Sequence, residues 1–287
     1  MFDQVAQFLV SGVTLGAIYA VVALGFTIIY NVTGIINFAQ GEFVMLGGML
    51  SFWLYGQAGL PLVAAFVIAI AVTALAGLAL DRLAIRPARN APVVSLIIIT
   101  IGASIFIRGL GGHLWGKDAV ALPAFSGETP IYLGGATVLP QTIWVLGTTL
   151  AAMLLFHLVL TRTMLGKALR ACAVNRRGAA IVGIDARVMS TVSFALSAGL
   201  GAVGGIVIAP LTMTSYDVGT MLGLKGFAAA ALGGFESQLG AVAGGLALGV
   251  LEALGAGYIS SAYKDAIALG VLFIALFARA WGSAREE

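Results

Sequence analysis

The stretch GIINFAQGE, residues 34–42, decides how this chain folds, because it interrupts two long apolar runs with two amides and a carboxylate. An acidic side chain at the centre of a bilayer costs roughly 3 kcal/mol on insertion scales. Such a break is tolerated where it is buried in protein or lines a water-filled cavity. The pattern therefore predicts a membrane protein with a discontinuous helix near residues 31–42, an arrangement that transporters use to build a path.

The composition of the whole chain agrees with a membrane protein. Of its 287 residues, 60% are hydrophobic and only 9% are charged, and the mean hydropathy is +1.06. A soluble domain carries about 25% charged residues. The net charge of +3 does not indicate nucleic-acid binding, because the basic residues fall between the apolar runs and not along one soluble face. A single cysteine, Cys172, excludes an internal disulfide, and the cysteine and histidine spacing predicts no metal site.

Eight segments are apolar enough to span a bilayer, for which about 20 apolar residues are needed. They are residues 8–30, 37–56, 61–80, 93–111, 142–160, 189–210, 239–258 and 264–281. A shorter apolar segment, residues 220–235, is either a ninth span or a re-entrant helix. We therefore expect an all-α, polytopic integral membrane protein of 8–9 transmembrane helices, forming a single transmembrane domain over residues 1–287.

The glycines indicate close helix packing. Gly201/Gly205, Gly240/Gly244 and Gly245/Gly249 are pairs of small residues four apart, which allow two helices to approach closely. We expect these pairs to serve packing within the chain more than dimerisation.

Positive charge predicts the orientation, because cytoplasmic loops carry an excess of Lys and Arg. Three arginines lie in residues 82–89, six basic residues lie in 161–187, and Arg279 and Arg285 lie near the end, which makes eleven of the fifteen. We expect this side to be cytoplasmic, with the N-terminus outside and the C-terminus inside. That arrangement needs an odd number of crossings and favours nine over eight.

The loop TRTMLGKALRACAVNRRGAAIVGIDAR, residues 161–187, is the second informative segment. Loops this long are uncommon unless they have a function. Good helix formers and small residues between Ala168 and Ile184 indicate a short helix along the cytoplasmic face that inserts into a groove on a partner. The alternative is a basic loop that only sets the topology and touches anionic lipid. The candidate coupling residues are Arg170, Ala171, Ala173, Gly178 and Gly183.

Several motifs resemble the LivH family, the permease subunits of ABC importers for branched-chain amino acids. They are GVTLGAIYA at 12–20 with ALGFT at 23–27, GIINFAQGE at 34–42, GKALRACA at 166–173 with GI at 183–184, and AAALGG at 229–234. The resemblance covers nearly the whole chain. The sequence departs from the family in two places. Gln40 stands where many relatives have a histidine, and the loop lacks the acidic residue that opens the ATPase-docking motif of many ABC importers.

The resemblance implies an importer built of several chains. This chain would be one of two dissimilar permease subunits, beside a LivM-like second subunit, in the bacterial inner membrane. Two ATP-binding subunits would bind below it, and a periplasmic binding protein would deliver leucine, isoleucine or valine. The chain would bind no cofactor, metal or nucleic acid and would not be an enzyme, since ATP is hydrolysed on the partner chains. Residues 161–187 would form the coupling loop.

The polar residues inside the apolar segments are candidates for the substrate path or for support of the broken helix: Asn37, Gln40, Glu42 and Glu252. A purely structural interpretation is also open. Asn37 would cap the second half-helix with Gln40 at its third position, as in a capping box, and Glu42 would lie in the first turn, where the helix dipole favours it. Glu252 should face the interior of the bundle and not lipid.

Two other functions stay open. The first is an importer of the same kind for urea or a short amide. The second is a stand-alone channel or an ion-coupled transporter, against which the basic, small-residue loop speaks. A membrane-embedded enzyme is not favoured, because no nucleophile–base pair or metal cluster is evident in the sequence.

Overall fold

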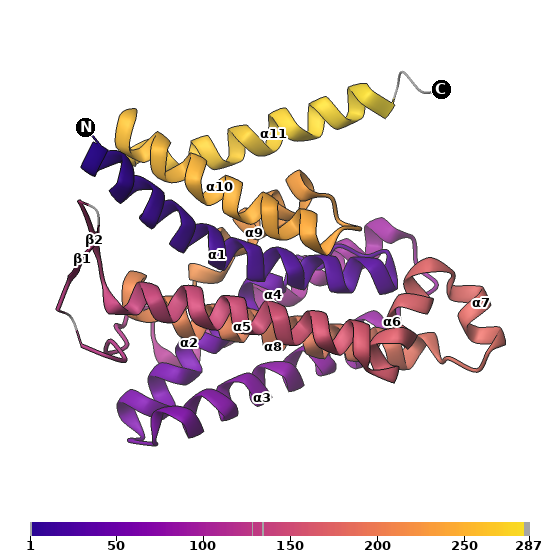
Figure 1. The fold of residues 1–287 in the computed structure, drawn as a ribbon. Coiled ribbons are helices and arrows are strands. Elements are labelled where there is room, and N and C mark those ends of the chain that lie inside the picture. Colours follow the sequence, from indigo (N-terminus) through magenta and orange to yellow (C-terminus); the bar gives the residue numbers. More distant parts are fainter. Residues whose placement is uncertain (1, 128, 134, 284–287) are drawn as a thin grey trace.

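The computed structural model describes residues 2–127, 129–133 and 135–283 as a bundle of helices (Figure 1). Within these residues, six helices are long and apolar enough to cross a membrane. They are α1 (Phe2–Thr33), α3 (Leu62–Leu80), α4 (Val93–Trp115), α5 (Pro140–Arg162), α8 (Ala186–Thr212) and α10 (Gln238–Tyr258). The prediction of a polytopic helical membrane protein is confirmed, although this criterion alone gives fewer spans than the 8–9 expected.

Shorter elements complete the chain. The helix α2 (Gln40–Ser51) continues as the π-helical segment η1 (Phe52–Gln57), and α3 continues as η2 (Asp81–Ile85). The others are α6 (Met164–Val174), α7 (Arg176–Ile181), α9 (Val218–Gly233), the 3-10 turn η3 (Ser261–Tyr263) and α11 (Lys264–Ser283). A small antiparallel hairpin of β1 (Ile131–Leu133) and β2 (Ala136–Val138) is added to the otherwise helical fold. Residues 284–287, which include Arg285, lie outside the described part.

The predicted break in the helix is confirmed. The helix α1 ends at Thr33, Gly34 adopts a left-handed φ of 73°, and the helix resumes at Gln40. Residues 34–39 lead the chain back from the end of α1 into the bundle, where Gln40 lies between Gly25 of α1 and Ser197 of α8. As a result, α2 begins inside the bundle and is buried over nearly its whole length.

The segment 220–235 forms α9, which runs between opposite ends of the bundle. The residues before it pair with the loop that follows α4, through Val120 and Thr214. At the other end, Asn31 of α1 donates hydrogen bonds of 3.4 Å to the carbonyls of Phe235 and Glu236. The 16 residues of α9 give a helix of about 24 Å, shorter than the usual span.

Glycines set the distance between the central helices. A Cβ on Gly249 of α10 would overlap the backbone of Gly16 in α1, and a Cβ on Gly245 would overlap that of Ala20. Gly205 of α8 lies equally close to Val44 of α2. The expectation that these glycines pack helices within the chain is confirmed.

The surfaces of α3, α4 and α5 carry exposed apolar side chains. Val67, Phe106 and Leu155, one from each helix, are 61%, 70% and 64% exposed. An apolar surface of this kind is typical of helices that face lipid or another subunit.

Candidate functional site

Gln40 is a fixed part of the bundle. Its side chain is fully buried, and its Nε2 donates to the carbonyl of Ser197 at 3.1 Å. The Ser197 hydroxyl is 2.6 Å from Gln40 Oε1 and 2.8 Å from the carbonyl of Gly25, and it can donate to either. The three residues thus join the start of α2 to α1 and α8. This network gives both ends of the amide a partner inside the bundle, which indicates a structural role for Gln40.

Asn37 supports the turn before α2. Its Oδ1 accepts a hydrogen bond from the backbone N–H of Ala39 at 3.1 Å, and its carbonyl accepts one from that of Gln40. The expected capping box is wrong, because the residue before the helix is Ala39 and Gln40 turns toward α8 instead of back to Asn37. The Nδ2 of Asn37 is buried and has no hydrogen-bond partner among the described residues.

Glu42 belongs to a group of polar residues that we call the α4–α9 cluster: Glu42, Ser104, Arg108 and Thr220. The Ser104 hydroxyl donates to Glu42 Oε1 at 2.8 Å, and Arg108 Nη1 donates to Thr220 Oγ1 at 2.7 Å. Glu42 itself is 1% exposed, whereas Arg108 is half-buried. Glu42 Oε2 lies against Gly219, next to Thr220, without a hydrogen-bond partner in the described structure. The cluster therefore joins α2, α4 and α9 around a buried carboxylate.

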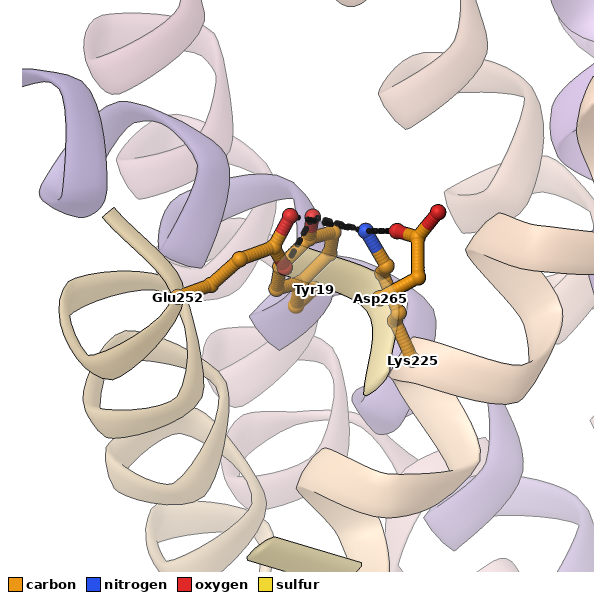
Figure 2. A network of polar contacts seen from close by, with 4 residues as sticks. All are labelled: Tyr19, Lys225, Glu252 and Asp265. Carbon is orange, nitrogen blue, oxygen red and sulfur yellow. Dashed lines mark hydrogen bonds and ion pairs between the residues drawn. The ribbon is translucent and has the colours of Figure 1, made fainter. Parts of the chain in front are cut away.

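Glu252 lies inside the bundle, as expected, in a second group that we call the Lys225 network: Tyr19, Lys225, Glu252 and Asp265 (Figure 2). Lys225 Nζ is 2.8 Å from Glu252 and 2.7 Å from Asp265. The Tyr19 hydroxyl donates to Glu252 Oε2 at 2.9 Å. The Lys225 and Glu252 side chains are almost fully buried, whereas that of Asp265 is 42% exposed. One cation and two carboxylates thus hold α1, α9, α10 and α11 together.

The partners of these carboxylates are not among the residues that the sequence pattern predicts. Lys225 is the one charged residue of α9, which is a visible signal of a functional or structural site in an apolar helix. Arg108 is likewise an isolated charge within α4. A third carboxylate, Asp81, is buried and accepts hydrogen bonds from the hydroxyls of Ser190 and Thr191. The sequence gives one indication of this role, since Asp81 directly follows the apolar segment 61–80.

The loop 161–187 forms two short helices, where a single helix was expected. The side chain of Thr163 caps α6 at the N–H of Gly166, and that of Asn175 caps α7 at the N–H of Gly178. Asn175 is extended, with a φ of −153°, so it ends one helix and starts the next. Gly183 then closes α7 with a left-handed φ of 85°. Capping residues divide the segment, and the continuous helix is wrong.

The candidate coupling residues, which lie on α6, on α7 and just after α7, differ in their exposure. Arg170, Ala173 and Gly183 are exposed, while Ala171 and Gly178 are half-buried. The buried side of α6, with Leu169 and Cys172, packs on α5 and α1. Large apolar side chains are exposed near the ends of both helices: Met164, Val174, Ile181 and Val182. This exposed apolar surface is suited to contact with another protein.

Two grooves border the α6–α7 pair. One, of about 800 Å³, lies between the end of α1, α5, α6 and the start of α10, and includes Arg170 and Ala173. The other, of about 690 Å³, is lined by four arginines: Arg89, Arg176, Arg177 and Arg187. The basic charge of this end of the bundle is thus gathered around the two short helices.

The buried half-helix, the charges held between apolar helices and the capped helix pair at one end are features of a polytopic transport protein. The chain matches the family described as branched-chain amino acid transport system / permease component over residues 8–276. It belongs to this family, which confirms the resemblance found in the sequence.

Individual relatives agree with this assignment. The chain is 36% identical to the high-affinity branched-chain amino acid transport system permease protein LivH of Escherichia coli strain K12, across 96% of this chain and 95% of the relative. It is 33% identical to the corresponding permease protein BraD of Pseudomonas aeruginosa, across 96% and 94%. The solved structure of PsaBC from Streptococcus pneumoniae in complex with Fab matches with a TM-score of 0.50 and 13% identity, covering 94% of this chain and 91% of that one, which shows a shared fold alone.

Proposed function

We propose that this permease subunit imports leucine, isoleucine and valine as part of an ABC importer in the bacterial inner membrane. The observation that carries the proposal is the identity of 33% to 36% with LivH and BraD along nearly their full length. Because the similarity extends through both the broken helix and the α6–α7 pair, it includes the buried core and the surface available to a motor subunit.

The membrane topology that fits best has nine crossings within one domain over residues 1–287. In it, α2 with η1, α9 and α11 cross in addition to the six long helices. The N-terminus and the β-hairpin lie outside, and the α6–α7 pair and the C-terminus lie in the cytoplasm. The arginines around α7 support this orientation through the positive-inside rule.

The assembly would contain a second, LivM-like permease subunit, two ATP-binding subunits and a periplasmic binding protein. ATP would bind to the partner ATPases, and this chain would bind no cofactor and catalyse no reaction. Closure of the ATPases on ATP would move α6 and α7, whose exposed Val174, Ile181 and Val182 would contact them. Since α6 packs on α5 and α1, the movement would reach the bundle. Transport would follow as a population shift between two packed states.

Within this machine, Asn37 and Gln40 would support the broken helix. Their hydrogen bonds to the backbone and to Ser197 favour that role over direct contact with the solute. Glu42 and Glu252 would hold the helices around α9 in register, through the α4–α9 cluster and the Lys225 network.

The proposal is tested by reconstituting the chain in proteoliposomes with its candidate partner subunits and a binding protein. We expect labelled leucine to accumulate only with ATP and with all subunits, and labelled urea to be excluded. Uptake of urea in place of leucine would assign the solute differently. Leucine flux through the chain without the ATPases would contradict an ABC importer and indicate a channel or an ion-coupled transporter.

A further inference from the structure

We propose that the uncovered face at the start of α9, formed by Asp217 just before the helix and by Met221 and Leu224 within it, lines a water-filled solute path and does not face lipid. This inference rests on the proposed function, because a second permease subunit would supply the opposite wall. The solute class that fits the face is a small zwitterion with an apolar side chain.

The face lies between the two polar groups described above. Thr220 of the α4–α9 cluster and Lys225 of the Lys225 network are five residues apart, which places them about 140° apart around the helix. Asp217, Met221 and Leu224 fall within that sector. Asp217 is exposed, Met221 is 37% exposed and Leu224 is half-buried. Figure 2 shows Asp265 reaching Lys225 from the neighbouring helix.

The depth of Lys225 and Arg108, which flank the face, argues against an ordinary position of these charges among lipid headgroups. Lys225 contacts Tyr19, which lies 14 residues before the end of α1 at Thr33, or about 21 Å along the helix. Arg108 lies 15 residues from the start of α4, a similar distance of about 22 Å. A hydrocarbon core of about 30 Å measured from that end would enclose both residues.

The charges on the two flanks argue for water at this face. Arg108 is half-buried and the Asp265 side chain is 42% exposed, so both are accessible from the surface between α4 and α11. Charged side chains within a bilayer face the interior of a bundle or an aqueous cavity, since exposure to lipid is costly. A guanidinium on one flank and a carboxylate on the other offer partners for the carboxylate and the ammonium of an amino acid, and Met221 between them offers an apolar contact.

The test is the reactivity of Met221→Cys toward a charged, membrane-impermeant thiol reagent. It is made in the complete complex in proteoliposomes, with Cys172→Ser removing the native thiol. The control is Val67→Cys, because Val67 of α3 is 61% exposed and lies at a similar distance from the same end of the bundle. We expect the cysteine at position 221 to react at least tenfold faster than the one at 67, and leucine-loaded binding protein with ATP to slow it severalfold.

Equal and slow reaction at both positions would overturn the proposal, because position 221 would then face lipid or a dry contact with protein. Fast reaction that leucine and ATP do not change would also overturn it, since the face would be wet without lying on the path. Leucine uptake is measured in matched vesicles for the complex that keeps Cys172 and for the Cys172→Ser complex. Normal uptake with an inert cysteine refutes only this inference, whereas absent uptake by the complex that keeps Cys172 would refute the proposed function itself.

Discussion

Ser197 holds Gln40 at both ends of its amide group, although 157 residues separate the two in sequence. The contact fixes the first residue of α2 against the middle of α8, and the same hydroxyl lies within hydrogen-bond distance of α1 at Gly25. The first N–H groups of a helix have no acceptor within the helix, and here those of Gln40 and Glu42 donate to the carbonyls of Asn37 and Ala39. The Gln40–Ser197 contact adds the anchor to the neighbouring helix.

Gln40→Ala should therefore destabilise the protein. The change removes two buried hydrogen bonds to Ser197, each of which contributes about 0.5–1.5 kcal/mol. The measurement is the thermal unfolding of the purified protein in detergent. Gln57→Ala, at an exposed position, is the control and should leave the unfolding temperature unchanged. Equal stability of the two variants would show that the Gln40–Ser197 pair does not anchor α2.

Gly249→Ala should separate α1 from α10. The new methyl group would overlap the backbone of Gly16, and overpacking of this kind costs about 1–3 kcal/mol. The matched change Gly102→Ala, in α4, places its methyl group in open space and should be harmless. Fluorescence size-exclusion chromatography after heating compares the two. A loss of folded protein in both variants would point to a general intolerance of substitution instead of a close helix contact.

Lys225→Met should be more harmful than Glu252→Gln. The first change leaves Glu252 buried without its cation, and breaking a buried pair on one side costs about 3–5 kcal/mol. The double variant should regain part of the loss, because no buried charge then lacks a partner. Folded yield in detergent is the readout, with Lys264→Met at an exposed site as the control. Strictly additive losses would argue against a coupled network.

Ala173→Trp should uncouple ATP hydrolysis from uptake. Ala173 is exposed on α6, so a bulky side chain disturbs a partner's contact without disturbing the bundle. We expect normal membrane levels, continued ATP hydrolysis and at least a tenfold loss of leucine uptake. Ala119→Trp, exposed in the loop after α4, is the control. Gly183 is unsuited to this test, because any side chain there strains its left-handed backbone. Unchanged uptake in Ala173→Trp would remove α6 from the coupling mechanism.

Thiol labelling should show which compartment contains α6. Cys172 is only 3% exposed and burial raises the pKa of its thiol, so it should react slowly from either side. The neighbouring Ala173→Cys, with Cys172→Ser, places a thiol at an exposed position. We expect an impermeant reagent to modify it in inverted vesicles and to spare it in intact spheroplasts. The reverse pattern would place the α6–α7 pair outside the cytoplasm.

Local patterns allowed the broken helix and its neighbours to be predicted, because polar residues in an apolar run are visible in a single sequence. The partners of those residues are not visible. Ser197 looks like an ordinary serine of a small-residue helix, and Lys225 finds Glu252 and Asp265 only when three helices pack together. The division of the loop at Asn175 had a signal, since asparagine commonly precedes a helix, but the small residues on either side suggested continuity.

The neutral amide at position 40 has a consequence for the conditions under which the bundle holds together. A histidine at this position would gain a proton as the pH falls from neutral to mildly acidic. Its acceptor ring nitrogen would then become a donor. Glutamine keeps the same donors and acceptors throughout that range. The contact that Gln40 makes between α1, α2 and α8 should accordingly contribute the same stability at mildly acidic pH as at neutral pH.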